Sequence, residues 1–155
     1  MKVRELMSKE VVSLSPEDTV VSAVERFTKH RVSGCPVIDA SGKLVGILSE
    51  TDILRALIMT SKTLRLIYPS LSMVSVAFVE DEQRKEILKA FKDISASKVQ
   101  KVMKTEVVTI DAESPVEDAI VKMKAMDINR IPVLSKGRVV GIITRHDIIK
   151  GLGNE

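Results

Sequence analysis

The chain has 155 residues, of which 45% are hydrophobic and 29% charged, with a formal net charge of +3. This length and composition are typical of one compact unit or two small ones with a buried core, and they exclude a disordered chain. Aromatic residues make up 3% and Trp is absent, so the core must be aliphatic, and aromatic platforms for single-stranded nucleic acid are not expected.

The sequence contains no pattern typical of export or membrane insertion. The single cysteine, Cys35, excludes an intrachain disulfide and fits a reducing cytoplasm, where we expect the protein to work. Residues 1–10 mix charges through their length and have no apolar signal core. No apolar run reaches the roughly 18 residues that a membrane helix needs, because Arg65 and Pro69 interrupt the longest one.

The chain repeats itself at an offset of 96 positions, which becomes 95 after a one-residue deletion. The aligned pairs include Met7 with Met103, Pro36 with Pro132, Gly46 with Gly141 and Asp52 with Asp147. Two copies of one supersecondary unit usually stack to bury a shared face. We therefore expect a first domain over residues 1–59, an insertion over residues 60–98 and a second domain over residues 99–155.

Each repeat begins with a short β-branched strand, predicted at residues 11–14 and 107–110. A helix is expected next, capped by Ser15 in the first repeat and by Asp111 in the second. Each helix has an apolar stripe, which indicates one buried face. The stripes consist of Val20, Ala23, Val24 and Phe27 in the first helix and of Val116, Ala119, Ile120 and Met123 in the second.

Hairpins follow at residues 36–48 and 132–143, each with a glycine in its turn. Closing helices are predicted at residues 52–59 and 147–152, so that the order in each repeat is β-α-β-β-α. This order predicts an α/β (α+β) fold.

The segment between the repeats has no counterpart elsewhere in the chain. Residues 82–99 are amphipathic, with an apolar face formed by Ile87, Leu88, Phe91 and Ile94. Such a face normally packs on its own protein, and binding of a partner is the alternative. Residues 71–79 are apolar and fit a strand, a helix or a packed loop.

In both repeats the last strand runs into Ser-x-x-Asp or Thr-x-x-Asp, namely Ser49 to Asp52 and Thr144 to Asp147. Alone, this pattern indicates a capping box, in which the two side chains satisfy free N–H groups at a helix start. A helix N-terminus also attracts phosphate, and an acidic residue one turn into the helix can accept the hydroxyls of a ribose. The repetition favours a binding role.

The segments 30–39 with 46–52, and 128–133 with 141–147, resemble cystathionine-β-synthase (CBS) domains. The chain as a whole resembles a tandem CBS pair, or Bateman module, over about residues 3–58 and 99–152. The resemblance implies two units packed about a pseudo-twofold axis, with the insertion outside the family core. It also implies two clefts for adenosine-type ligands, namely AMP, ADP, ATP or S-adenosylmethionine.

By this resemblance, each cleft combines the Ser/Thr-x-x-Asp of one unit with the first strand and the residues before Pro-Val of the other. The first cleft is expected to contain Ser49, Asp52, Val108, Ile128, Asn129 and Arg130. The second is expected to contain Thr144, Asp147, Val12, Val32, Ser33 and Gly34, with Arg145 as a further ligand-binding residue.

The residue types fit this division. The two carboxylates suit a ribose diol, and the apolar Val12, Val32, Val108 and Ile128 suit an adenine ring. Arg130 favours a phosphate in the first cleft because its planar fork binds anions in pairs of contacts. Gly34 takes the place of Arg130 in the second cleft, so we expect Arg145 or His146 to attract the anion there.

Residues for turnover are not apparent in the sequence. Cys35 precedes a proline in an apolar strand and is interpreted as a buried small hydrophobe. His30 and His146 have no metal-ligand spacing, and no glycine-rich phosphate loop is present. We therefore expect neither an enzyme nor a metal site, and no cofactor beyond an adenine nucleotide acting as a regulatory ligand.

The expected function is that of a freestanding regulatory module that signals energy or metabolite status to a separate, unidentified protein partner. The alternative is a structural scaffold or a nucleic-acid-associated protein with vestigial clefts. The modest, evenly spread charge gives no support to nucleic acid as a partner. Exposed apolar helix faces predict a homodimer, and no membrane association is expected.

Overall fold

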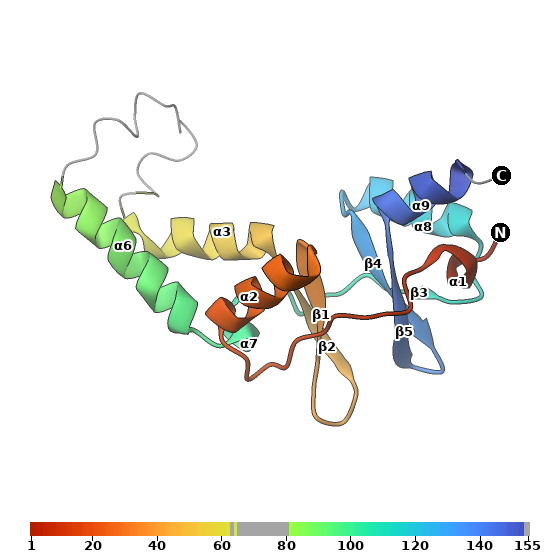
Figure 1. Cartoon of the computed structure of the whole chain (residues 1–155), viewed down its shortest axis with the longest axis horizontal. Helices are drawn as coiled ribbons and strands as arrows, with labels where there is room; N and C mark the ends of the chain where they lie inside the picture. Colours follow the sequence, from red (N-terminus) through yellow and green to blue (C-terminus); the bar gives the residue numbers. More distant parts are fainter. Residues whose placement is uncertain (63, 65–80, 154–155) are drawn as a thin grey trace.

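The computed structural model describes residues 1–62, 64 and 81–153, which form two similar halves (Figure 1). The sheets of both halves lie toward the centre of the molecule and most helices lie outside them. The first half contains α2 (Val20–His30), β1 (Gly34–Ile38), β2 (Leu44–Ser49) and α3 (Glu50–Thr60). The second half contains β3 (Ile110–Asp111), α8 (Val116–Ala125), β4 (Arg130–Ser135), β5 (Arg138–Thr144) and α9 (Arg145–Leu152). The expected mixed fold is confirmed.

The two predicted hairpins are confirmed. β1 pairs with β2 and β4 pairs with β5, both antiparallel. The turn residues Gly42 and Gly137 have φ angles of +85° and +77°, a region that glycine enters without steric cost. The closing helices α3 and α9 also form, slightly longer than predicted, with Ser49 and Thr144 as their N-caps.

The short strands predicted at residues 11–14 and 107–110 are largely wrong. In the first half only Leu14 bridges to the sheet, in parallel with Val37. In the second half only the two residues of β3 pair with β4, also in parallel. The rest of each segment runs outside the ladders.

Proline explains why these ladders stop. The amide of Leu14 donates to the carbonyl of Pro36 at 2.9 Å, and the next bond of a parallel ladder would need the N–H of Pro36 itself. Proline has no N–H to donate, and Pro132 stands at the equivalent place in β4. Val12 and Val108 are therefore left unpaired in the ladders, and each lines a cleft between the halves.

The predicted caps Ser15 and Asp111 are also wrong, because both helices begin later. Thr19 is the N-cap of α2, and Pro115 precedes α8. The carboxylate of Asp18 accepts the backbone N–H of Ser15 at 2.8 Å, and that of Asp111 accepts a backbone N–H two residues on at 2.8 Å. These bonds close turns, so the chain enters each helix only after the turn.

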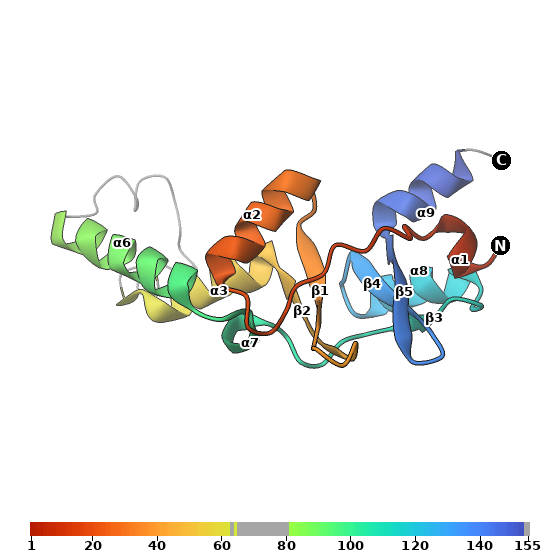
Figure 2. The same ribbon diagram turned by 60° about the horizontal axis from the view of Figure 1, so that its bottom comes forward.

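Two short helices were not indicated by the sequence, and each packs against the half that is formed mainly by the other repeat. α1 (Val3–Leu6) packs into the core of the second half, and α7 (Val99–Val102) packs into the core of the first. Figure 2 shows the N-terminal segment running from α1, beside the second half, across to α2 in the first. We therefore propose that the ranges 1–59, 60–98 and 99–155 describe how the sequence is divided. They do not correspond to domains that fold independently.

The exchanged segments make equivalent contacts, as two units about a pseudo-twofold axis should. Ser8 bridges to Ile142, and Lys104 bridges to Ile47. Gly141 and Gly46 contact the methionines that precede these bridges. An added Cβ on Gly141 would stand 2.5 Å from the sulfur of Met7, and one on Gly46 would stand closer still to the sulfur of Met103. Glycine is thus needed at both crossings for close approach.

The cores are aliphatic, as the composition predicts. Most of the predicted stripes are buried, including Val20 and Met123. Val24 and Ile120, which are equivalent in the two repeats, are 42% and 44% exposed. The helices α2 and α8 thus each keep an apolar residue on their outer surface.

The insertion contributes α6 (Asp81–Ala96), close to the predicted helix. Its buried residues are Ala90 and Ile94, and it contacts α3 and α2, so the expectation that it packs on its own protein is confirmed for this side. Leu88 and Phe91, which were expected on the packed face, are exposed. The apolar segment 71–79 lies outside the described residues. In the described part of the chain, no helix is both long and apolar enough to span a bilayer.

The exchange predicts that residues outside a repeat stabilise it. Val3 and Val99 are fully buried, so Val3→Ala and Val99→Ala should each lower the free energy of unfolding by about 1–3 kcal/mol. Urea denaturation followed by circular dichroism measures this. Lys101→Ala, at an exposed position of α7, is the control and should change stability by less than about 0.5 kcal/mol. Unchanged stability of Val99→Ala would contradict the packing of α7.

Candidate functional site

Two clefts lie between the halves. The first has a volume of about 610 Å³ and the second about 650 Å³, within the range of small-molecule sites. The structure brings together all residues that the sequence placed in the first cleft: Ser49, Asp52, Val108, Ile128, Asn129 and Arg130. It does the same in the second cleft for Thr144, Asp147, Val12, Val32, Ser33 and Gly34, with Arg145 beside them. Ligand binding by these residues stays a prediction.

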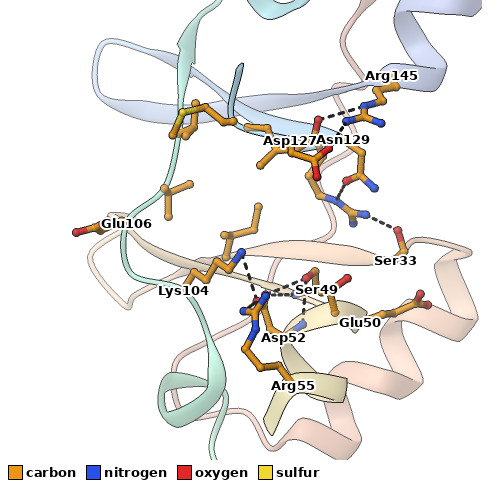
Figure 3. Close-up of a pocket in the computed structure, with 17 residues that line it drawn as sticks. Ser33, Ser49, Glu50, Asp52, Arg55, Lys104, Glu106, Asp127, Asn129 and Arg145 are labelled. Atoms are coloured by element: carbon orange, nitrogen blue, oxygen red, sulfur yellow. Dashed lines mark hydrogen bonds and ion pairs between the residues drawn. The ribbon is translucent and has the colours of Figure 1, made fainter. Parts of the chain in front are cut away.

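The first cleft has a capping box at the start of α3 (Figure 3). Oδ2 of Asp52 accepts the backbone N–H and the hydroxyl of Ser49, both at 2.9 Å. The other oxygen, Oδ1, lies 3.4 Å from Arg55 and 3.8 Å from Lys104. Asp52 is only 4% exposed, and these contacts compensate the cost of burying its charge. The carboxylate is therefore held in one orientation at the cleft wall.

The second cleft has the same box at the start of α9. Oδ2 of Asp147 accepts the backbone N–H of Thr144 at 2.8 Å and its hydroxyl at 2.7 Å. Within the described residues no cation lies within ion-pair distance of Asp147. The position equivalent to Lys104 is Ser8, which lines this cleft. The two clefts thus share the box and differ in the charges around it.

The position of Arg130 differs from the expected division of charge between the clefts. It was expected to face the first cleft only, but it lines both. Its Nη2 donates to the hydroxyl of Ser33, and its Nε donates to the side-chain oxygen of Asn129 at 3.1 Å. Burial lowers the pKa of the guanidinium below its usual value, while the nearby charges of Glu50 and Asp52 oppose this. The group stays protonated at neutral pH.

Arg145 also lines both clefts, but its contacts lie within the second half. Its Nε donates to the carbonyl of Ile128 at 3.2 Å, and Nη2 pairs with Asp127 at 3.4 Å. His146, the other expected source of positive charge, lines the second cleft. In Figure 3, Arg145 and Asp127 lie on the wall opposite Ser49 and Asp52.

The sequence analysis missed several charged residues of the first cleft. Arg55 could have been found, because it stands one helical turn after Asp52 and faces the same way. Lys104 gave no signal, because it reaches the cleft only through the exchanged segment and its repeat equivalent is a serine. The remaining missed charged side chains are Glu50, Glu106 and Asp127.

The first cleft therefore combines three kinds of wall. Apolar side chains from both halves offer a surface for a flat ring: Ile47, Val107, Val108, Met126 and Ile128. The buried carboxylate of Asp52 can accept hydroxyl donors. Cations stand on several sides, supplied by Arg55, Lys104, Arg130 and Arg145. Such a set suits a molecule with an apolar ring, a diol and an anionic group.

The comparisons with known proteins agree with the two repeats. The family model described as CBS domain matches residues 3–59 and 99–154. Uncharacterized protein MJ1426 of Methanocaldococcus jannaschii is 32% identical over 98% of this chain and 91% of its own length. Some other curated relatives are much longer, and the chain spans only 23% of their length.

Solved structures show the same fold. The CBS domain of a CBS domain containing membrane protein from Sphaerobacter thermophilus has a TM-score of 0.69 at 30% identity, covering 97% of this chain and 86% of that one. The CBS domain pair of protein MJ0100, solved with 5'-methylthioadenosine and S-adenosyl-L-methionine, has a TM-score of 0.69 at 24% identity, covering 99% and 97%.

Cys35, in β1 and in the core of the first half, is predicted to be unreactive in the folded chain. Its side chain is fully buried, and burial raises the pKa of the thiol to about 11, against the opposing charges of Arg130 and Arg26. Because the thiolate is the reactive form, iodoacetamide at pH 8 should leave the native protein unlabelled and label it in denaturant. Mass spectrometry measures both, and labelling of native protein at the rate of a free thiol would contradict the burial.

Proposed function

Since this chain belongs to the CBS-domain family, with matches over residues 3–59 and 99–154, we propose that it is a regulatory module for adenosine-type ligands. The ligand binds in the clefts between the halves, and its binding changes how the halves interact with each other and with a separate protein partner. Catalysis has no place in this proposal.

One observation carries the proposal: each cleft joins a capped helix start from one half to an apolar wall from the other. In the first cleft, Asp52 stands at the start of α3 and Val108 comes from the opposite half. In the second, Asp147 stands at the start of α9 and Val12 comes from the opposite half. A ligand that uses both walls binds only when the halves are correctly docked. Its binding energy is therefore linked to their arrangement.

The carboxylates are proposed to accept the ribose hydroxyls, and the valines to contact the adenine ring. The free N–H groups of α3 and α9 favour an anion at the same end. In the first cleft Lys104 and Arg55 stand beside Asp52, where phosphate oxygens could replace part of their contact with the carboxylate. We therefore propose a phosphorylated adenosine, such as AMP, as the ligand of the first cleft.

S-Adenosylmethionine is the other class of ligand under this proposal. The neighbour solved with 5'-methylthioadenosine and S-adenosyl-L-methionine shows that a CBS pair of this fold takes such ligands. Its ligands carry no phosphate, whereas several cations face the first cleft of this chain. A panel of AMP, ADP, ATP and S-adenosylmethionine by thermal shift distinguishes the classes, because a ligand that binds only the folded state raises Tm.

A second copy of the chain is the proposed structural partner. Val24 and Ile120 expose apolar side chains at equivalent positions of α2 and α8, and Leu54 and Ile149 do so on α3 and α9. These helices cover the outer faces of the two halves (Figure 1). A symmetric dimer would cover such equivalent patches together.

Replacing the cleft residues predicts a specific pattern of affinities. Asp52→Ala should weaken AMP about 10- to 100-fold, because charged hydrogen bonds contribute about 1.5–3 kcal/mol. Arg130→Ala should weaken AMP far more than adenosine, because only the phosphate contact is lost. Calorimetry of both ligands against wild type, Asp52→Ala, Asp147→Ala and Arg130→Ala measures this.

The melting temperature of each variant is the control for folding. Asp52→Ala also removes one side of the capping box, at about 0.5–2 kcal/mol, which a native domain of ordinary stability tolerates. Equal weakening of AMP and adenosine by Arg130→Ala would show that Arg130 does not contact phosphate. Absence of nucleotide binding, together with salt-dependent DNA binding, would favour a nucleic-acid-associated protein instead.

The dimer is tested by light scattering at micromolar concentration, where the mass of two chains is expected. Val24→Glu combined with Ile120→Glu places charge in the proposed interface and should yield a monomer with unchanged circular dichroism. Lys29→Glu, at an exposed position on α2, is the control and should remain dimeric. A monomeric wild type would remove this part of the proposal.

A further inference from the structure

Gly34 and Arg130 are equivalent positions of the two repeats, separated by the offset of 96. In the folded chain they meet each other: a Cβ on Gly34 would lie 2.5 Å from Nη1 of Arg130 and 2.8 Å from the carbonyl oxygen of Leu48. Equivalent positions that touch lie on the axis relating the two halves. There is room on this axis for one long side chain, and the guanidinium of Arg130 occupies it.

Both halves hold this guanidinium. Ser33, from the first half, accepts from Nη2 through its hydroxyl, and Asn129, from the second half, accepts from Nε at 3.1 Å. Ser33 and Asn129 are themselves equivalent in the repeats. All three residues line both clefts, and Figure 3 shows Ser33 and Asn129 at the side of the first cleft. Arg130 is therefore accessible from either side of the axis.

We propose that Arg130 is one phosphate-binding cation shared by two clefts, so that an anionic ligand in one cleft weakens the binding of an anionic ligand in the other. The inference rests on the proposed function and adds a form of regulation to it. A guanidinium binds a phosphate best with two N–H groups directed at the same anion. Once it turns to one cleft, the other cleft loses that contact.

The coupling depends on charge. A neutral ligand such as adenosine makes no demand on Arg130, so its binding in one cleft leaves the other unaffected. For two anionic ligands the effect is reciprocal, since linkage requires the same factor in either order of binding. Arg145 also lines both clefts, but its guanidinium contacts the carbonyl of Ile128 and the carboxylate of Asp127, both in the second half.

Single-cleft variants separate the contributions. Asp147→Ala weakens the second cleft and leaves the first intact. Asp52→Ala weakens the first cleft and leaves the second intact. Adding Arg130→Ala should weaken AMP about 10- to 100-fold in each of these variants, and should leave adenosine nearly unchanged. In the wild-type chain, Arg130→Ala should weaken only the tighter of two AMP binding steps, because the second ligand already binds without Arg130. The measurement is isothermal titration calorimetry at about 0.15 M salt. At this concentration the salt screens direct repulsion between ligands more than about 8 Å apart.

Arg55→Ala is the matched control, because Arg55 lines the first cleft alone. It should weaken AMP where the first cleft is intact and have no effect in the Asp52→Ala chain. If Arg130→Ala unfolds the protein, Arg130→Gln removes the charge while keeping a donor for Ser33. That variant should give the same pattern.

The outcomes are distinct. If adding Arg130→Ala weakens AMP in only one of the two single-cleft variants, Arg130 belongs to the cleft that is intact in that variant. This result overturns the sharing. Equal weakening of both AMP binding steps by Arg130→Ala in the otherwise wild-type chain also overturns it. So does a coupling between the two clefts that is as strong with adenosine as with AMP. In each of these cases nucleotide binding, and with it the proposed function, stands. Absence of both AMP and adenosine binding to the wild-type chain overturns the proposed function and this inference together.

Discussion

Each half of the molecule depends on a short segment that the chain supplies from outside that repeat. A sheet of two or three short strands with two helices has too little apolar surface of its own to form a stable core. Val99 completes the core of the first half, and Val3 completes that of the second. The burial of these segments also fixes the crossings beside Gly46 and Gly141. The relative position of the two halves therefore follows from the way their cores are completed.

The clefts are a consequence of the same constraint together with the two prolines of the hairpins. Pro36 and Pro132 have no N–H with which to continue the parallel ladders. The segments carrying Val12 and Val108 therefore lie outside the ladders. Because the exchanged segments hold the halves against each other, these valines line clefts opposite the starts of α9 and α3. Each cleft needs both halves, and neither repeat contains a complete one.

Local signals in the sequence predicted local structure well. The capping box at Ser49 and Asp52 forms as expected, because both partners stand three residues apart on one helix turn. The helix N-cap predicted at Ser15 was wrong. The carboxylate of Asp18, three residues later, accepts the N–H of Ser15, and this bond can close a turn as readily as it can cap a helix. The exchanged helices α1 and α7 could not be predicted, since four-residue helices have almost no periodicity and are stabilised by contacts distant in sequence. The residues that the resemblance assigned to each cleft lie together in the structure, while the position of Arg130 between the clefts could be found only from the structure.

The meeting of Gly34 and Arg130 also bears on why two repeats in one chain differ from two copies of a single repeat. A symmetric pair of identical units must place the same residue twice on its axis, which gives either two crowded guanidiniums or none. Fusion of the repeats removes that requirement, because each position on the axis can then vary alone. A pair of identical units cannot place an odd number of charges at the centre of its twofold arrangement, whereas this chain places one there.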